Sequence, residues 1–130
     1  MSMLTVDAID LHYGAAQALR RVSITAQAGQ VTCVMGRNGV GKTTLNRALS
    51  GLIPSRAGSI RFLGEAIAGR KPAEIVSAGL IHVPEGRRIF PNMSVRDNLV
   101  LGSYRRGKAD RETNLERIFA LFPRLRERMA

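Results

Sequence analysis

The sequence predicts an α/β fold, and three of its features carry that prediction. Alternating apolar and polar residues, typical of strands, fill the first part of the chain, whereas helical spacing dominates its last third. A glycine-rich loop at residues 36–41 separates a short apolar run from a helical segment. Apolar residues make up 45% of the 130 residues, which suits a packed core and excludes a disordered polar chain.

Strands are expected mainly in the first half of the chain. Residues 4–11, 22–26 and 59–63 alternate apolar and polar side chains, which is typical of half-buried strands. Residues 31–35 and 80–83 are instead continuous apolar runs with β-branched members. Such runs indicate strands that are buried on both faces of a sheet.

Helices are expected after each of the main turn signals, over residues 43–51, 73–78, 94–101 and 110–122. Gly79 is a typical stop for the second of them. Ser94 and Asp97 form an S-x-x-D capping box that predicts the start of the third. After Pro123 the helical pattern resumes for a turn or two.

The chain is strongly basic, with 20 Lys and Arg against 10 Asp and Glu and a formal charge of +10. Such a surplus in a small domain is typical of proteins that bind nucleic acid, acidic lipid or another polyanion. Two explanations stay open: a binding surface, or a chain whose balancing acidic residues lie elsewhere. Aromatic residues are only 5%, and no helix-turn-helix, RNA-recognition or zinc pattern is present, which disfavours nucleic acid.

Other classes of protein are disfavoured by simple absences in the sequence. No run approaches the roughly 18 apolar residues of a membrane-spanning helix. The first seven residues lack the basic-then-apolar pattern of a secretory signal. Cys33 is the only cysteine, so there is no disulfide framework, and a reducing cytoplasm is expected. Because Cys33 lies within the apolar run 31–35, we expect a buried, unreactive thiol.

Residues 36–43 read Gly-Arg-Asn-Gly-Val-Gly-Lys-Thr and match the phosphate-loop pattern G-x-x-x-x-G-K-[ST]. Glycines let backbone N–H groups converge on phosphate oxygens, and the following helix adds its positive end. Lys42 is expected to reach the β- and γ-phosphates of a nucleotide, and the Thr43 hydroxyl to ligate Mg²⁺. The expected nucleotide contacts in this segment are Gly36, Arg37, Asn38, Gly39, Val40, Gly41, Lys42, Thr43 and Thr44.

The residues around this loop resemble those of ATP-binding cassette (ABC) ATPases. Tyr13-Gly14 resembles the aromatic element on which these proteins stack adenine, and residues 18–23 resemble their second strand. Residues 82–99 read His-Val-Pro-Glu-Gly-Arg-Arg-Ile-Phe-Pro-Asn-Met-Ser-Val-Arg-Asp-Asn-Leu. That segment is similar to the ATPase subunits of branched-chain amino-acid importers, with urea importers as the alternative. The resemblance extends over essentially the whole chain.

The resemblance implies an α/β phosphate-loop NTPase of the ABC type, in truncated form. It would comprise an antiparallel β subdomain, part of the parallel core sheet and the start of a helical subdomain. Residues 1–93 would be the first part of the nucleotide-binding core, with the phosphate loop at 36–43 and a Q-loop-like segment at 84–93. Residues 94–130 would begin the helical subdomain and end before the signature motif.

The resemblance also implies a role in transport. ATP and Mg²⁺ would be the cofactors, and the partners would be integral-membrane permease subunits, a second ATPase subunit and, indirectly, a periplasmic binding protein. The place of action would be the cytoplasmic face of a bacterial inner membrane. Glu85 occupies a position where most ABC ATPases carry glutamine, and it is expected to contact the nucleotide or Mg²⁺ together with Thr43. Arg87 and Arg88 either touch nucleotide or permease or form an exposed basic loop.

Three pieces that the family uses for hydrolysis have no counterpart in these 130 residues. They are a Ser-Gly-Gly-Gln signature, an apolar strand that ends in Asp-Glu, and a later histidine, since the histidines here are His12 and His82. We therefore expect no catalytic residues in this chain, binding of ATP without turnover, and marginal folding because sheet edges are unpaired. A short regulatory or decoy protein is the alternative to a truncated subunit.

Overall fold

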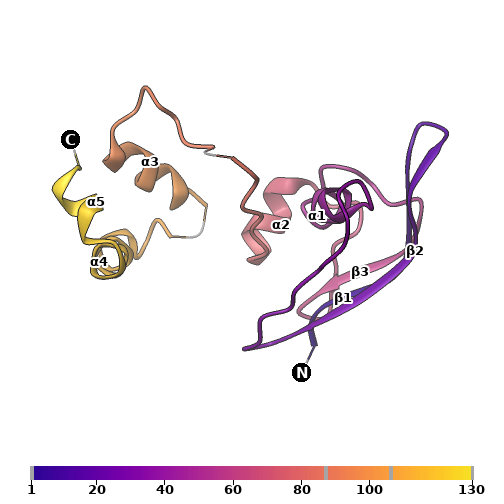
Figure 1. Ribbon diagram of the computed structural model, residues 1–130. Coiled ribbons are helices and arrows are strands. Elements are labelled where there is room, and N and C mark those ends of the chain that lie inside the picture. Colours follow the sequence, from indigo (N-terminus) through magenta and orange to yellow (C-terminus); the bar gives the residue numbers. More distant parts are fainter. Residues whose placement is uncertain (1, 87, 106, 130) are drawn as a thin grey trace. The chain divides into compact units, whose positions relative to one another are not determined.

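The computed structural model describes residues 2–86, 88–105 and 107–129, so the candidate Arg87 lies outside the described residues. The chain divides into two compact units, Met1–His82 and Val83–Ala130, and each is described by itself (Figure 1). The first unit contains an antiparallel sheet with two helices, and the second contains three helices. Among the described residues, no helix has both the length and the apolar character needed to cross a membrane.

The sheet of the first unit has four strands in the order β2-β1-β3-β4, and every pairing is antiparallel. The strands are β1 (Ser2–Tyr13), β2 (Ala16–Gln27), β3 (Ala57–Phe62) and β4 (Glu65–Ala66). The predicted strands at 4–11 and 22–26 are confirmed within β1 and β2, and that at 59–63 is confirmed in β3 except for Leu63, which lies in the following turn. The two-residue strand β4 was not predicted, because two residues are too few to show a period of two.

Two irregularities bend the long hairpin of β1 and β2. Ala8 and Arg21 have positive φ values of 46° and 45°, and the register shifts between Val6 and Ile9. Polar side chains accept hydrogen bonds from the backbone N–H groups at these points. The Ser23 hydroxyl accepts from Ala8 N at 2.8 Å, and the Asp10 carboxylate accepts from Arg21 N at 2.8 Å. The bulges therefore leave these two donors satisfied and increase the local twist of the strands.

One face of the sheet is covered by α1 (Lys42–Leu49) and α2 (Pro72–Ala78), which lie on the same side of the strands (Figure 1). The core that they form with the sheet consists of Val6, Ile9, Leu11, Leu19, Leu45, Ala48, Ile60, Phe62, Ile67 and Ile75. Each large aliphatic side chain buried here stabilises the unit by about 1.5–3 kcal/mol. Both helices were predicted, and the left-handed Gly79, φ 110°, ends α2 as expected.

The predicted strands at 31–35 and 80–83 are wrong for this structure. Neither segment pairs with a described strand, and Val31, Met35 and Val83 are 93%, 89% and 86% exposed. Cys33 is also exposed, contrary to the expected buried thiol. A strand of a parallel sheet needs hydrogen-bonded neighbouring strands, and the described residues supply none for these segments, although Leu80 packs against the core. His82, which was expected in a strand, lies half-buried in irregular backbone.

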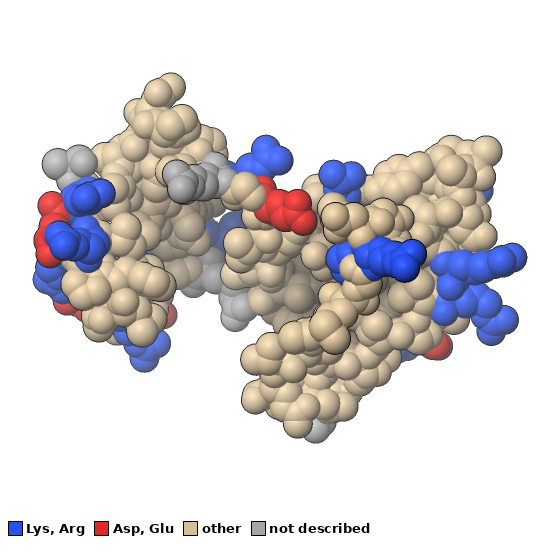
Figure 2. Space-filling model, in the orientation of Figure 1, with Lys and Arg blue, Asp and Glu red and all other residues tan. Residues whose placement is uncertain are grey.

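The second unit consists of α3 (Val95–Gly102), α4 (Arg111–Leu121) and α5 (Pro123–Glu127), which confirms the three predicted helical segments. Ser94 caps α3, since its hydroxyl accepts from Asp97 N at 3.1 Å. Leu115 and Phe119 of α4 are buried. Basic side chains are prominent on the face of the molecule that Figure 2 shows. In the second unit, Arg124 pairs with Glu127 and Arg126 with Glu116.

Gly58 on β3 gives the first testable prediction. Its φ is 85°, and a Cβ there would lie 2.4 Å from Asp7 O and 2.5 Å from Ala8 O, opposite the bulge in β1. We expect Gly58→Ala to lower the free energy of unfolding by at least about 2 kcal/mol, from left-handed strain plus backbone clash. Gly64→Ala is the matched control, because Gly64 has φ 84° and open space around its Cα, so about 1 kcal/mol is expected. Urea denaturation followed by circular dichroism measures the free energy of unfolding of both variants. Equal losses of this free energy would contradict the proposed backbone clash at Gly58.

Candidate nucleotide-binding site

The phosphate loop is anchored where it meets α1. Gly41 precedes the helix in the left-handed conformation, with φ 107°. A Cβ at this position would lie 2.7 Å from Leu19 Cδ2 and 3.1 Å from Ala18 O on β2. Glycine is therefore required both by the backbone conformation and by the close approach of the loop to the strand.

The first turn of α1 offers backbone donors to a ligand. The first helical hydrogen bond runs from Leu45 N to Gly41 O, at 2.8 Å. The amides of Lys42, Thr43 and Thr44 precede it and have no partner within the helix. No side chain caps this end of α1, so the donors and the positive end of the helix suit an anionic group.

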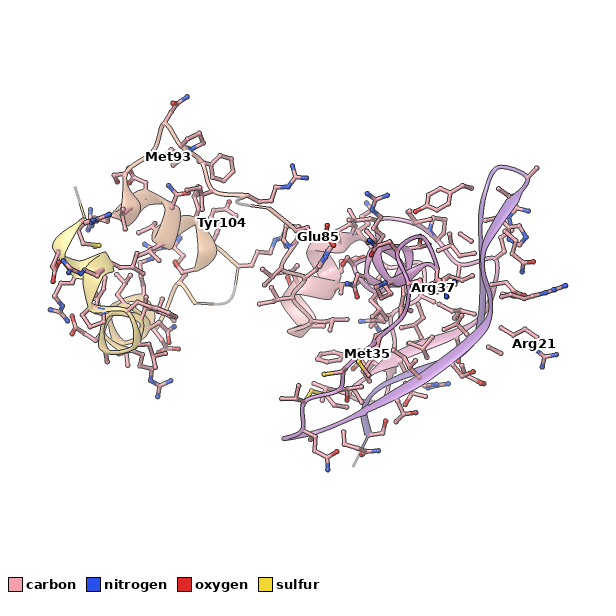
Figure 3. The ribbon with its side chains drawn as sticks, viewed as in Figure 1. Arg21, Met35, Arg37, Glu85, Met93 and Tyr104 are labelled. Carbon is pink, nitrogen blue, oxygen red and sulfur yellow. The ribbon has the colours of Figure 1, made fainter. Side chains whose placement is uncertain are left out.

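Lys42 is held over the loop by the loop's own carbonyl groups. Its Nζ donates to Gly36 O at 2.5 Å and to Arg37 O at 2.7 Å. These carbonyl oxygens occupy the acceptor role that phosphate oxygens would take in a nucleotide complex. Figure 3 shows Arg37 beside α1. Residues 36–40 are all exposed, so a phosphate chain can reach the loop from solvent.

Tyr13 lies next to the phosphate-loop helix. Its hydroxyl is 3.4 Å from Thr44 Oγ1, and Arg47 Nη1 donates to it at 3.5 Å. The pKa of the Tyr13 phenol is lowered from its ordinary value, first by the hydrogen bond with Thr44 and then by that from Arg47. The structure thus brings the predicted aromatic residue and the predicted loop together. Arg47 was missed, although its position three residues after Thr44 puts both on one face of α1.

Arg56 fixes the β1–β2 hairpin that carries Tyr13. Its guanidinium Nη2 donates to Gly14 O at 3.1 Å, and its backbone N donates to Asp10 O at 2.8 Å. Gly14, with φ 61°, forms the two-residue turn directly after Tyr13. Sequence reasoning missed Arg56, because a contact across 42 residues leaves no periodic signal.

The two predicted Mg²⁺ ligands belong to different units. Thr43 is exposed in the first turn of α1, and its hydroxyl oxygen is a donor type that Mg²⁺ accepts. Glu85 is an exposed residue of the second unit, and its backbone carbonyl accepts from Arg88 Nε at 3.3 Å. No group of three or more His, Cys, Asp or Glu gathers among the described residues. Thr43 therefore fits an ion that is held mainly by nucleotide phosphates.

Asn98 organises the loop that follows Glu85. Its Oδ1 accepts from Phe90 N at 2.9 Å, and its Nδ2 donates to the carbonyls of Phe90, Met93 and Ser94 at 3.1, 3.3 and 3.0 Å. The loop presents Phe90, which is 58% exposed, at the surface of the second unit. The sequence signalled only the Ser94–Asp97 cap, because a side chain that bonds backbone carbonyls leaves no pattern in the residue types.

Comparisons with known proteins identify the family that this chain resembles. The sequence model described as "ABC transporter" matches residues 19–128. The high-affinity branched-chain amino acid transport ATP-binding protein BraG of Pseudomonas aeruginosa is 38% identical over 126 residues, which are 97% of this chain and 54% of BraG. The arabinose import ATP-binding protein AraG of Chromohalobacter salexigens is 36% identical over 86% of this chain and 23% of AraG.

Among solved structures, an ATP binding subunit of an ABC transporter superposes with a TM-score of 0.84 and 26% identity. The matched region covers 98% of this chain and 52% of that subunit. The chain thus spans about half the length of BraG and of the solved subunit, and about a quarter of AraG.

Asn98 gives a prediction for the loop at 90–94. Asn98→Ala should raise the hydrogen-exchange rate of the Phe90 amide by about three- to tenfold, because a solvent-accessible hydrogen bond of this kind contributes about 0.5–1.5 kcal/mol. Asn92→Ala, at an exposed position in the same loop, is the control and should leave that rate unchanged. Hydrogen exchange of the Phe90 amide is measured by NMR. An unchanged exchange rate in a folded Asn98→Ala chain would contradict the role of Asn98 in holding this loop.

Proposed function

The chain belongs to the ABC transporter family, and from that premise we propose that it binds ATP through its phosphate loop as part of the ATP-binding subunit of an importer. The observation that carries the proposal is the arrangement of Lys42 over a helix start whose first three amides are unbonded within the helix. Such a start binds phosphate through oriented N–H groups and a positive helix end.

Three kinds of contact from the chain's own residues account for binding. The Lys42 ammonium exchanges the carbonyls of Gly36 and Arg37 for phosphate oxygens, so a neutral acceptor is replaced by a charged one and the hydrogen bond becomes stronger. The amides at the start of α1 donate to the same phosphate chain. Tyr13, which is 44% exposed, offers an open ring face for stacking with the base.

Mg²⁺ fits this proposal through Thr43 at the start of α1. When bound, the ion would neutralise charge on the phosphate oxygens. Thr43 would contribute one hydroxyl oxygen, and its exposure leaves room for phosphate and water ligands. The roles of Glu85 toward nucleotide and metal are proposed by resemblance to the family.

For the cargo, we propose a branched-chain amino acid, with urea or another short amide as the alternative. The similarity to BraG over 97% of this chain supports the first choice. The chain is also similar to AraG, an arabinose import protein, so the similarity extends to an importer of a different solute. The proposed partners are permease subunits and a second ATPase subunit, at the cytoplasmic face of the inner membrane.

We further propose that the 130-residue chain binds ATP without sustained hydrolysis. Its sequence contains no Asp-Glu pair after an apolar run and no Ser-Gly-Gly-Gln segment. In the family, these groups supply a general base and hydrogen-bond donors for the γ-phosphate. Steady release of phosphate by the purified chain, abolished by Lys42→Ala, would refute this proposal.

ATP binding itself is tested with Lys42→Ala. Because a charge-assisted hydrogen bond contributes about 1.5–3 kcal/mol, the Kd for MgATP should rise by about ten- to a hundredfold. Lys108→Ala removes the same charge from an exposed position in the second unit and serves as the control. Isothermal titration calorimetry measures both. Equal affinities of the two variants would contradict the assignment of Lys42.

A further inference from the structure

Arg47 is placed so that it links the phosphate-loop helix to the aromatic residue at the end of β1. The side chains of Leu45 and Ala48 enter the core, whereas Arg47 is exposed. Its guanidinium donates to the Tyr13 hydroxyl at 3.5 Å, and Thr44 on the same face approaches that hydroxyl at 3.4 Å. Two groups from α1 thus converge on one phenol oxygen.

The charge of Arg47 is not taken up by an acidic side chain in the described part of the chain. The ion pairs found there join other residues, Arg70 with Glu65, Arg124 with Glu127, and Arg126 with Glu116. Its described hydrogen bond is therefore to a neutral phenol. A cation at this point lowers the cost of negative charge on the phenol, in agreement with the lowered pKa of Tyr13.

Tyr13 is consequently fixed at both ends. Its backbone pairs with Ala16 across the hairpin, and its hydroxyl is tied to α1. Contacts of this kind favour one rotamer of the Tyr13 side chain before a ligand arrives, which lowers part of the entropic cost of binding. The ring remains 44% exposed, so the tether does not cover it.

We propose that Arg47 is a positioning residue that holds the Tyr13 ring in place for the nucleotide base, so that recognition of the base depends on Arg47 whereas binding of the phosphates does not. This inference rests on the proposed function, since it assumes that the phosphate loop binds nucleotide. It assigns a role to a residue outside the phosphate-loop motif. It also divides the site into a phosphate part, held by Lys42 and the amides of α1, and a base part, held by the Tyr13–Arg47 tether.

The experiment compares two ligands that share the phosphate chain. ATP carries the base, and inorganic tripolyphosphate carries the phosphates alone. Arg47→Gln and Tyr13→Phe each break the tether, the second while keeping the ring. Each should weaken ATP binding by about fivefold and leave tripolyphosphate binding within about twofold of the unsubstituted chain, as expected for the loss of one exposed hydrogen bond. Calorimetry on the unsubstituted chain and on both variants gives the six affinities.

Two controls separate positioning from charge. Arg20→Gln removes one positive charge from β2 at a position next to the buried Leu19, hence on the opposite face of the sheet from α1, and should leave the ratio of the two affinities unchanged. The double variant Tyr13→Phe/Arg47→Gln should lose no more ATP affinity than Tyr13→Phe alone, because Tyr13→Phe already removes the hydroxyl that Arg47 contacts. Additive losses would overturn the tether.

A direct readout on Tyr13 makes the test independent of ligand binding. In a Tyr104→Phe background Tyr13 is the only tyrosine, so absorbance titration follows its phenol alone. Arg47→Gln should raise the pKa of Tyr13 toward its ordinary value, and an unchanged titration would overturn the proposed contact.

The outcomes also separate this inference from the proposed function. If the unsubstituted chain binds neither ATP nor tripolyphosphate, both the proposed function and the role of Arg47 are refuted. If it binds ATP and Arg47→Gln weakens both ligands equally, only the positioning role is refuted, since Arg47 then acts by charge alone. The positioning role is also refuted, and the proposed function is not, if Arg47→Gln leaves both affinities unchanged.

Discussion

The close approach of Gly41 to strand β2 determines how the whole phosphate site is built. Because no side chain stands between the loop and Leu19, α1 begins directly against the sheet, and Leu45 and Ala48 enter the core. The direction of the helix then follows from its buried face, and the amides at its start project toward the loop. The same rotation of the helix places Thr44 and Arg47 toward Tyr13. One glycine contact therefore links the core, the phosphate donors and the aromatic residue.

The phosphate loop and the loop at 90–94 are each held by a side chain of their own that makes several hydrogen bonds to the backbone. Lys42 donates to two carbonyls of the phosphate loop, and Asn98 bonds four backbone groups of the loop at 90–94. The consequences differ because the side chains differ in charge. An ammonium prefers phosphate oxygens to neutral carbonyls, so the Lys42 contacts are exchangeable for a ligand. The amide of Asn98 is neutral and both its oxygen and its nitrogen are matched to backbone groups, so its contacts serve to shape the loop.

The sequence predicted those elements whose stability is local or whose face is half-buried. The periods of β1, β2 and β3, the cap at Ser94 and the stop at Gly79 are each set by neighbouring residues, and each is confirmed. The phosphate loop was found for the same reason, since its residue types follow from the backbone conformation that phosphate requires. Contacts between distant segments, such as Arg56 with Gly14 and Arg47 with Tyr13, left no signal. The segments at 31–35 and 80–83 have the composition of buried strands, but a strand exists only where a neighbouring chain segment pairs with it.

This asymmetry has a consequence for the phosphate loop itself. On its C-terminal side the loop is secured by Gly41 and the buried part of α1, whereas on its N-terminal side it follows a segment, 31–35, that pairs with no described strand. The carbonyls of Gly36 and Arg37 are tied to the anchored side only through Lys42, which is also the residue that a nucleotide would engage. In the proposed complex, a phosphate chain would replace these internal hydrogen bonds with bonds to the ligand. Lys42 would then leave the carbonyls of Gly36 and Arg37, and the loop would be held through the bound phosphates instead.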